Sequence, residues 1–241
     1  FWPLNREHKS QVRLLGRPII YWTVKGLVEK GIQDIIVVCS KDSTIPIMLK
    51  EENDLGVKLS FVTQEERKGT GDALWQAKDF VKEPFFVVWP SKVTSGDLAQ
   101  KILEKQKQEN TEVVLVGAKT TTPWDYGVAR MEGNRLVEII ENPVRGKEPS
   151  NIKVTGFYYL GHDYFTHYEK LSRHHEADFI DALNSYLKEK SASLVQLKED
   201  VPALKYPWEL FGILDILLRL WGEKQMIASS VKIGEGTIIQ G

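Results

Sequence analysis

Three runs of apolar residues constrain the fold of the first half of the chain. Residues 35–39, 85–89 and 112–118 are almost continuously apolar, as in strands that are covered on both faces of a parallel sheet. Segments with apolar residues at helical spacing follow the first two runs and precede the third, with short connections between them. This alternation predicts right-handed βαβ units, and therefore an α/β fold. The helices predicted in this half cover residues 18–29, 45–52, 72–82 and 98–109.

The second half of the chain loses this alternation. Residues 126–131 and 136–141 flank a turn that contains Gly133 and Asn134, which is typical of a β-hairpin. Further strands are predicted at 154–160 and 193–197, and further helices at 164–172, 179–190 and 208–220. Because no linker rich in Pro, Gly or Ser interrupts the chain, we expect one continuous domain over residues 1–224, in which the second half adds a lid to the same sheet.

A Gly-Thr-Gly sequence follows the strand predicted at residues 59–63. Gly69 and Gly71 allow positive φ angles, so the backbone around Thr70 can lie close to a flat or charged ligand. The next helix would direct its first amide groups and the positive end of its dipole at this loop. Gln64 offers one amide group and one carbonyl, the pair needed to read the edge of a base. The alternative is a turn that only joins strand to helix.

The composition narrows the class of protein. The 241-residue chain has a formal net charge of −1 and is 42% apolar, which is typical of a soluble globular protein. This charge argues against bulk electrostatic binding to nucleic acid or to an anionic membrane. No apolar run approaches the ~20 residues needed to span a bilayer. Cys39 is the only cysteine, so we expect a reducing, cytoplasmic environment and no internal disulfide.

Residues 231–239 show a different pattern, in which branched apolar residues are followed by glycine. This spacing is typical of the hexapeptide repeat of a left-handed β-helix, in which one coil cannot bury its own face. We therefore expect residues 225–241 to begin a left-handed β-helix segment. The alternative is a tail that docks as a single strand.

Short motifs occur along the whole chain in a fixed order. They are Phe-Trp-Pro-Leu at 1–4, the run from Lys9 to Pro18, Gln64 with residues 69–74, Tyr-Gly-Val at 126–128, Glu-Asn-Pro at 141–143, Val-Thr-Gly-Phe-Tyr at 154–158 and Pro-Trp-Glu-Leu at 207–210. Together they resemble the sugar nucleotidylyltransferases, in particular the glucose-1-phosphate thymidylyltransferases and the related UTP-dependent enzymes. The resemblance implies a Rossmann-like nucleotide-diphospho-sugar transferase fold, with a mixed, mostly parallel sheet flanked by helices.

The resemblance also implies a reaction. A sugar-1-phosphate oxygen would attack the α-phosphorus of a nucleoside triphosphate, forming an NDP-sugar and releasing pyrophosphate. The substrates would be dTTP or UTP and a hexose 1-phosphate, with Mg²⁺ as the cofactor. Because little covalent chemistry falls to the protein, its residues would position the substrates and neutralise their charge.

The site residues are carried over from the matching motifs. Lys9 and Arg13 would act as catalytic residues on the phosphates, and Gln64, Gly69, Thr70 and Gly71 would bind the nucleotide. The sugar would be held by Tyr126, Gly127, Glu141, Asn142, Thr155, Gly156 and Tyr158. Without the family, each of these residues also fits an ordinary role, such as a sheet aromatic, a surface lysine or a solvated hairpin charge.

Several features depart from the family's pattern. A Gly-rich phosphate loop and a central first strand should precede Phe1, so we expect further residues upstream of it. Ser91, a neutral and weak Mg²⁺ ligand, stands where the family has a metal-binding Asp, and Lys92 beside it is another source of positive charge. Asn142 replaces a lysine that binds the sugar phosphate, and Glu209 replaces a second metal-binding Asp.

These departures leave three functions open, because losing a carboxylate and a lysine would reduce the stabilisation of the transition state. The first is an enzyme that makes dTDP- or UDP-glucose, with Mg²⁺ held by Glu209 and the triphosphate. The second is a nucleotide-binding or regulatory relative with impaired catalysis. The third is a scaffold subunit that assembles through its C-terminal segment. A homo-oligomer fits the resemblance, since a β-helix tail favours a trimer and transferase domains alone often pair.

Overall fold

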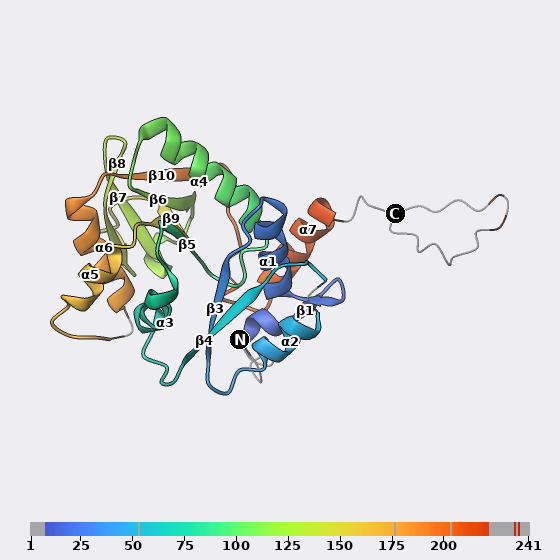
Figure 1. Ribbon diagram of the computed structural model, residues 1–241. Helices are drawn as coiled ribbons and strands as arrows, with labels where there is room; N and C mark the ends of the chain where they lie inside the picture. The colour runs from blue at the N-terminus through green and yellow to red at the C-terminus, as the bar shows by residue number, and fades with distance from the viewer. Residues whose placement is uncertain are drawn as a thin grey trace.

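The computed structural model describes residues 8–221, except 53, 176 and 203, together with residues 234 and 236. The α-helices (Figure 1) are α1 (Ile19–Glu29), α2 (Ile45–Glu51), α3 (Thr70–Gln76), α4 (Ser95–Glu109), α5 (Tyr164–Glu169), α6 (Asp178–Glu189) and α7 (Glu209–Trp221). The strands are β1 (Arg13–Leu14), β2 (Arg17–Pro18), β3 (Ile35–Ser40), β4 (Leu59–Gln64), β5 (Phe85–Val88), β6 (Val113–Lys119), β7 (Gly127–Glu132), β8 (Arg135–Glu141), β9 (Ile152–Leu160) and β10 (Ala192–Leu197). Short 3₁₀ helices cover Lys9–Gln11, Lys78–Phe80 and Pro123–Asp125.

The largest sheet has six strands and is mixed. Its order is β10-β6-β9-β7-β8, and β5 pairs with β9. β10 runs parallel to β6, whereas β9 runs antiparallel to both β5 and β6, so β5, β6 and β10 point in the same direction. β3 and β4 form a separate parallel pair that is connected through α2. The predicted α/β class and mixed sheet are therefore confirmed.

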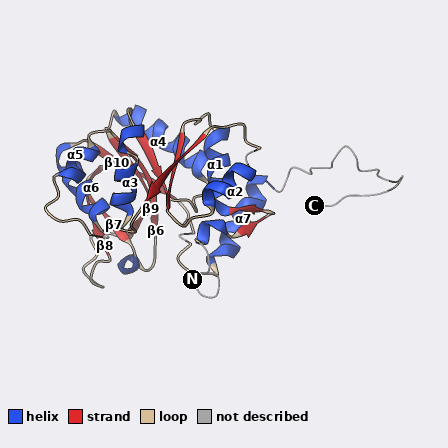
Figure 2. Cartoon of the chain, turned by 60° about the horizontal axis from the view of Figure 1, so that its bottom comes forward, coloured by secondary structure: helices blue, strands red, loops and turns tan. Residues whose placement is uncertain are grey.

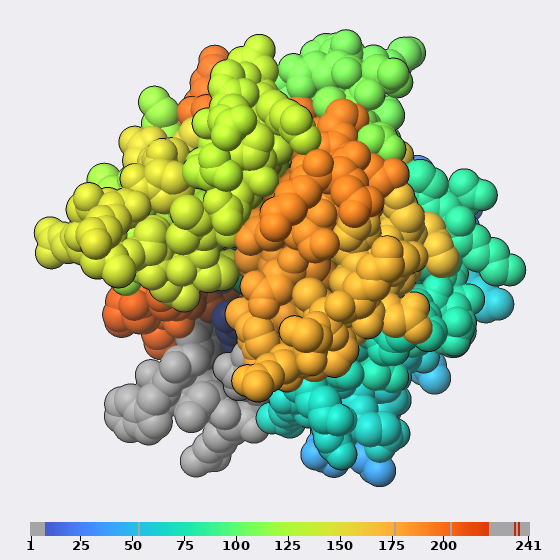
Figure 3. Space-filling view, turned by 90° about the vertical axis from the view of Figure 1, so that its left-hand side faces the viewer, coloured from blue at the N-terminus to red at the C-terminus, as the bar shows by residue number. Residues whose placement is uncertain are grey.

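Helices cover both faces of the six-stranded sheet (Figure 2). α5 and α6 lie on one face with α3 beside them, and α4 lies on the other face with α1 packed against it. Figure 3 shows the outer side of the first layer, where α5 and α6 (yellow to orange) lie next to the β7–β8 hairpin (yellow-green). The predicted hairpin is thus part of the sheet, and the helices that follow it cover that sheet.

β6 shows why the strand-forming runs are continuously apolar. Val113 and Leu115 belong to the core under α5 and α6, while Val114 and Val116 belong to the core under α4. Successive side chains of a strand point to opposite faces, so a strand that is buried on both faces has to be apolar throughout.

A close contact between α1 and α4 fixes the turn that follows β5. A Cβ atom on Gly96 would collide with the Gly26 carbonyl, so the helices approach to backbone distance here. Ser95 Oγ donates to Thr23 O at 2.6 Å, and Thr23 Oγ1 donates to Pro90 O at 2.9 Å. The turn that carries Ser91 and Lys92 is therefore held by two helices.

The structure corrects two local predictions. The helix predicted at 72–82 ends at Gln76, because the amide groups of Ala77 and Phe80 bond three residues back and tighten the chain into 3₁₀ turns. Residues 13–18 form the hairpin β1–β2, so Pro18, predicted as the first residue of a helix, ends β2 and α1 begins at Ile19. Leu15 and Gly16 have φ angles of 51° and 77°, as in a two-residue type I′ turn.

The predicted β-helix segment, residues 225–241, lies outside the described residues apart from 234 and 236. That prediction, the domain boundary near residue 224 and the strand expected upstream of Phe1 stay predictions. Within the described part of the chain, every helix is too short or too polar to cross a membrane.

Candidate functional site

Charged side chains gather where β5, β6 and β10 end. Ligands of open α/β sheets bind beyond the carboxyl ends of the strands, so a site is expected at this edge. Residues 89–93 form the turn after β5, and Lys153 lies opposite Ala118 near the end of β6. Residues 198–208 lead from β10 to α7 (Figure 1). We call this segment the β10–α7 connection.

Three lysines from distant parts of the chain contact the β10–α7 connection. Lys9 Nζ donates to Leu204 O at 2.8 Å, and Lys92 Nζ donates to Pro202 O at 3.2 Å. Lys153 Nζ forms an ion pair with Asp200 Oδ1 at 2.6 Å. We call Lys9, Lys92 and Lys153 the lysine cluster.

Two members of the lysine cluster are buried. Lys92 and Lys153 are each only 3% exposed, which is rare for lysine. Burial, and after it repulsion from Lys153, lowers the pKa of Lys92 to about 8, although Asp200 and Glu209 act in the opposite direction. Burial also lowers the pKa of Lys9, and Glu209 offsets part of this effect. The cluster is therefore a region of positive charge with little solvent around it.

Tyr126, a predicted sugar-binding residue, contacts the lysine cluster. Its ring centroid lies 4.4 Å from Lys153 Nζ and 5.4 Å from Lys205 Nζ, as in cation–π contacts. Burial is the first cause of the raised pKa of the Tyr126 hydroxyl. The Tyr126 carbonyl accepts a hydrogen bond from Asn142 N at 3.1 Å, so the two predicted residues are neighbours.

Gly127 and Glu141 face each other across the β7–β8 hairpin. A Cβ atom on Gly127 would collide with Glu141 Oε1, so the glycine makes room for the carboxylate. Desolvation raises the pKa of the Glu141 carboxyl even though the residue is exposed. Asn142 follows with φ 44°, a left-handed conformation that asparagine tolerates better than lysine does. The local backbone thus gives a reason for asparagine at this position.

The Gly-Thr-Gly loop is held by its own contacts. Gln64 is buried, and its Nε2 atom donates to Gly69 O at 3.0 Å and to Asp72 Oδ2 at 2.7 Å. Gly69 has φ 104°, which favours glycine. Thr70 begins α3 and is half-buried. Gln64 Nε2 thus forms both of its hydrogen bonds within the protein. The role of Gln64 in reading a base stays a prediction.

Gly71 has a close contact that the sequence did not indicate. A Cβ atom there would collide with Asp178 Oδ1 and lie 2.5 Å from Tyr168 Cε2. Asp178 is fully buried, and its Oδ2 accepts from the Tyr168 hydroxyl at 2.7 Å. The second glycine therefore lets α3 pack against α5 and α6, in addition to any role toward a ligand.

The loop that leads to Gly-Thr-Gly lies within electrostatic reach of His8, the neighbour of Lys9. Burial, followed by the charges of Lys9 and Arg67, lowers the pKa of His8. Arg67 belongs to the loop between Gln64 and Gly69. The residue next to Lys9 is therefore within electrostatic reach of the predicted nucleotide loop.

The predicted sugar residues on β9 make contacts within the protein. Thr155 Oγ1 donates to Val116 O at 3.1 Å. Gly156 has φ 76°, and a Cβ atom there would lie 2.5 Å from the Trp89 ring. Tyr158 is 2% exposed and meets Phe179 edge to face at 5.0 Å. These contacts account for the residue types, and the sugar-binding roles stay predictions.

Arg13 contacts a different part of the molecule. Its guanidinium donates to Gly16 O at 2.8 Å and pairs with Glu52, just after α2. Arg17 pairs with the same carboxylate. The structure records no contact between Arg13 and the lysine cluster within residues 8–221, and its catalytic role stays a prediction.

The residues at the expected metal position do not fit a protein-held Mg²⁺. Ser91 is buried and offers only a neutral hydroxyl. Glu209 Oε2 accepts hydrogen bonds from the backbone amides of Lys205 and Tyr206, at 2.5 and 2.7 Å. Among the described residues, no three His, Cys, Asp or Glu side chains gather into a group that could hold a metal without a substrate's phosphates. Lys92, a cation, lies beside Ser91 instead.

Sequence reasoning did not single out Lys153 or Asp200. The available signal was a lysine within the otherwise apolar and hydroxyl-bearing run at 152–160. Asp200 carried no signal, because the path of the β10–α7 connection depends on tertiary packing.

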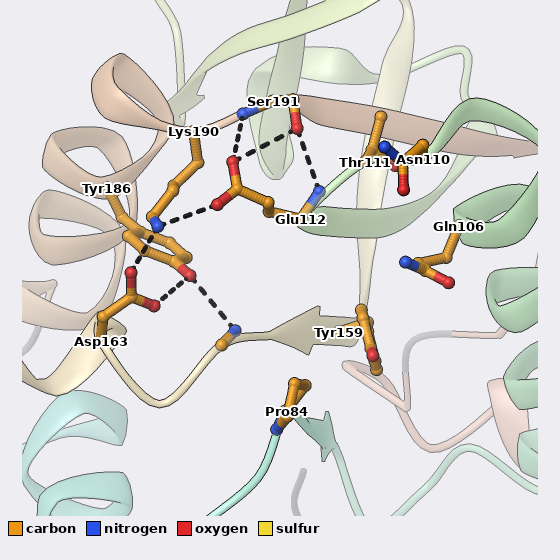
Figure 4. A pocket seen from close by; sticks show the side chains of 11 residues that line it. Pro84, Gln106, Asn110, Thr111, Glu112, Tyr159, Asp163, Tyr186, Lys190 and Ser191 are labelled. Carbon is orange, nitrogen blue, oxygen red and sulfur yellow. Dashed lines mark hydrogen bonds and ion pairs between the residues drawn. The ribbon is translucent and has the colours of Figure 1, made fainter.

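A hollow of about 490 Å³ lies at the opposite edge of the sheet, where β6 and β10 begin (Figure 4). Its charged groups form ion pairs with one another. Lys190 pairs with Asp163 at 2.5 Å and with Glu112 at 2.9 Å. The Tyr186 hydroxyl donates to Asp163 Oδ1 at 2.6 Å. None of the predicted site residues lines this hollow.

The family model described as "Nucleotidyl transferase" matches residues 1–220. The chain belongs to this family. A bifunctional sugar-1-phosphate nucleotidylyltransferase/acetyltransferase of Sulfurisphaera tokodaii is 30% identical over 215 residues, which are 85% of this chain and 49% of that protein. A UTP–glucose-1-phosphate uridylyltransferase of Staphylococcus saprophyticus is 28% identical, over 73% of this chain and 72% of that protein. The chain thus spans about half the length of the Sulfurisphaera relative.

The fold also matches that of solved structures. A Bacillus anthracis protein assigned as a glucose-1-phosphate thymidylyltransferase, crystallised with sucrose, aligns with a TM-score of 0.75 at 19% identity. The match covers 98% of this chain and 92% of that one. The nucleotidyltransferase fold implied by the sequence motifs is therefore confirmed.

Proposed function

We propose that the chain transfers a nucleotidyl group to a sugar 1-phosphate, forming an NDP-sugar of the dTDP- or UDP-glucose type and releasing pyrophosphate. One observation carries this proposal beyond family membership. Lys9 and Tyr126, which are far apart in the sequence, both lie at the carboxyl edge of the sheet: Lys9 contacts the β10–α7 connection, and the Tyr126 ring lies against Lys153 and Lys205. The charge of Glu209, at the end of that connection, acts on Lys9 and Lys92. Names of the relatives, including the Staphylococcus uridylyltransferase, support the same reaction.

Each group has a role that follows from its chemistry. Attack by the sugar-phosphate oxygen on the α-phosphorus brings together two anions, so the first requirement is positive charge. The lysine cluster supplies it in a poorly solvated place, where charge acts more strongly than in water. Tyr126 and Glu141 would position the sugar, and the loop from Gln64 to Gly71 would hold the base. Because the donor set does not fit Mg²⁺, we assign it no step.

The substrates and the setting belong to the same proposal. We infer dTTP or UTP as the nucleotide and a hexose 1-phosphate as the acceptor, since both nucleotide classes occur among the relatives. A cytoplasmic setting agrees with the single cysteine, Cys39.

The reaction is tested by measuring pyrophosphate release from UTP or dTTP with and without glucose 1-phosphate. We expect release that requires both substrates. In Gln64→Ala the KM for the nucleotide should rise by about tenfold or more, because a lost contact to a polar edge costs about 1–3 kcal/mol. The KM for glucose 1-phosphate should stay within about threefold, since a base contact does not touch the sugar.

Gln108→Ala, an exposed glutamine on α4, is the matched control and should leave both constants unchanged. Equal nucleotide KM values in Gln64→Ala and wild type would remove Gln64 from the site. Nucleotide binding without turnover would favour the impaired relative instead.

A further inference from the structure

Lys92 and Lys153 are two buried cations that the family resemblance does not account for. A buried ammonium group is costly unless its hydrogens are satisfied, and it carries three of them. Within the described residues, one acceptor, Pro202 O, lies within hydrogen-bond distance of Lys92 Nζ, at 3.2 Å. Lys153 Nζ meets Asp200 and the face of Tyr126. The two ammonium groups therefore have spare capacity for an anion.

The groups that face this pair come from the β10–α7 connection. They are the Asp200 carboxylate and the Pro202 carbonyl, and Leu204 O meets the adjacent Lys9. The Glu209 carboxylate also acts on Lys92 and on Lys9. The three ammonium groups of the lysine cluster against these two carboxylates leave an excess of positive charge. The Asp200 side chain is 54% exposed, so solvent screens its side of the ion pair with the buried Lys153. Leu204 is fully buried and anchors the end of the segment.

We propose that Lys92 and Lys153 form a binding site for the phosphate groups of a phosphorylated substrate, and that the Asp200 carboxylate occupies this site in the ligand-free chain. The identity of the ligand rests on the proposed function. Lysine binds phosphate as a point charge, and the site lies at the sheet edge where ligands of such folds bind. Cations thus stand beside Ser91, where the family resemblance leads one to expect a carboxylate that holds a metal.

Binding of a phosphate would release Asp200 from Lys153. The bond that breaks is the ion pair between Lys153 and Asp200, and the bonds that form join both ammonium groups to phosphate oxygens. Asp200 is therefore an internal competitor, so removing its charge should tighten binding. A purely structural role for the ion pair predicts the opposite.

The test is the titration of inorganic triphosphate, UTP and glucose 1-phosphate into the full chain by calorimetry, with and without Mg²⁺. Lys153→Met and Lys92→Met should weaken triphosphate binding by about tenfold or more, since hydrogen bonds to charged groups are stronger than those between neutral groups. Lys153→Arg should restore at least part of it. Asp200→Asn should tighten binding severalfold. Comparison of the triphosphate and sugar-phosphate arms shows which phosphate the pair takes.

Lys101→Met is the matched control, because it removes the same charge from an exposed position on α4. It should bind as the wild type does. Affinities within twofold of wild type in both lysine variants, or weaker binding in Asp200→Asn, would overturn the proposal. Asp200→Asn keeps the test decisive if a lysine variant fails to fold, because its side chain is half-exposed.

Triphosphate binding and pyrophosphate release together distinguish the phosphate site from the proposed reaction. Lysine-dependent triphosphate binding without release of pyrophosphate from any substrate pair supports the site and contradicts the reaction. Turnover that is unchanged in Lys153→Met, with unchanged triphosphate affinity, supports the reaction and contradicts the site.

Discussion

At the scale of single residues, Lys92 carries a positive charge in a place from which solvent is excluded. Its ammonium group is buried beside Lys153, with Lys9, Asp200 and Glu209 as the other charges that act on it. Burial opposes the charged form, so the folded chain holds this proton less tightly than the unfolded chain does. A buried lysine that lowers the free energy of unfolding at neutral pH is more typical of a functional site than of a hydrophobic core.

The shifted pKa of Lys92 makes the stability of the chain depend on pH. The pKa of Lys92 is about 8 in the folded chain and 10.5 ordinarily, so between these values the unfolded state binds more protons and the free energy of unfolding rises with pH. Below pH 8 the penalty is fully present, and it amounts to about 3 kcal/mol. Lys92→Met should therefore be more stable than wild type at pH 7, with the difference shrinking toward pH 10.5.

Urea unfolding of both proteins across this range measures the effect. Lys101→Met serves as the control and should follow the wild-type curve. Parallel curves for Lys92→Met and wild type would show that the ammonium group is not desolvated.

At the scale of elements, α6 completes the open edge of β8. Asn184 Oδ1 accepts from Ile139 N at 2.8 Å, and Asn184 Nδ2 donates to Ile139 O at 2.8 Å. The side chain thus takes the place of one residue of a further strand. It ties the helix to the hairpin that carries Glu141, and an unpaired strand edge is otherwise prone to association.

We predict that Asn184→Leu destabilises the chain by about 2–4 kcal/mol, because it leaves one buried donor and one buried acceptor unpaired. Thermal and urea unfolding measure the loss. Lys188→Leu, on the exposed side of the same helix, should change stability by less than about 0.5 kcal/mol. A similar small change in Asn184→Leu would mean that water replaces the amide without cost.

The positions of helices and strands could be predicted from the sequence where a buried element has to be apolar, as in β6. Two features of the fold could not be predicted in this way. β9 inserts antiparallel between β5 and β6, and the choice of strand partners is non-local. The β1–β2 turn places Leu15 at positive φ, which its residue type does not suggest.

At the scale of the whole molecule, the fold brings the predicted residues to the same edge only in part. Lys9 and Glu209 bond to the β10–α7 connection, and Tyr126 lies against Lys153 of the lysine cluster. The ion pair between Asp200 and Lys153 could not be predicted from the sequence, because it depends on how the β10–α7 connection packs. It also could not show that Arg13 pairs with Glu52, since surface ion pairs carry no periodic signal.

The reverse reaction is the most direct test of the account. The full-length protein is incubated with radiolabelled pyrophosphate and UDP-glucose or dTDP-glucose, and the nucleotides are separated. The account predicts label in UTP or dTTP, formed only when the matching NDP-sugar is present. No label in either triphosphate at saturating NDP-sugar, with or without Mg²⁺, would contradict the proposed nucleotidyl transfer.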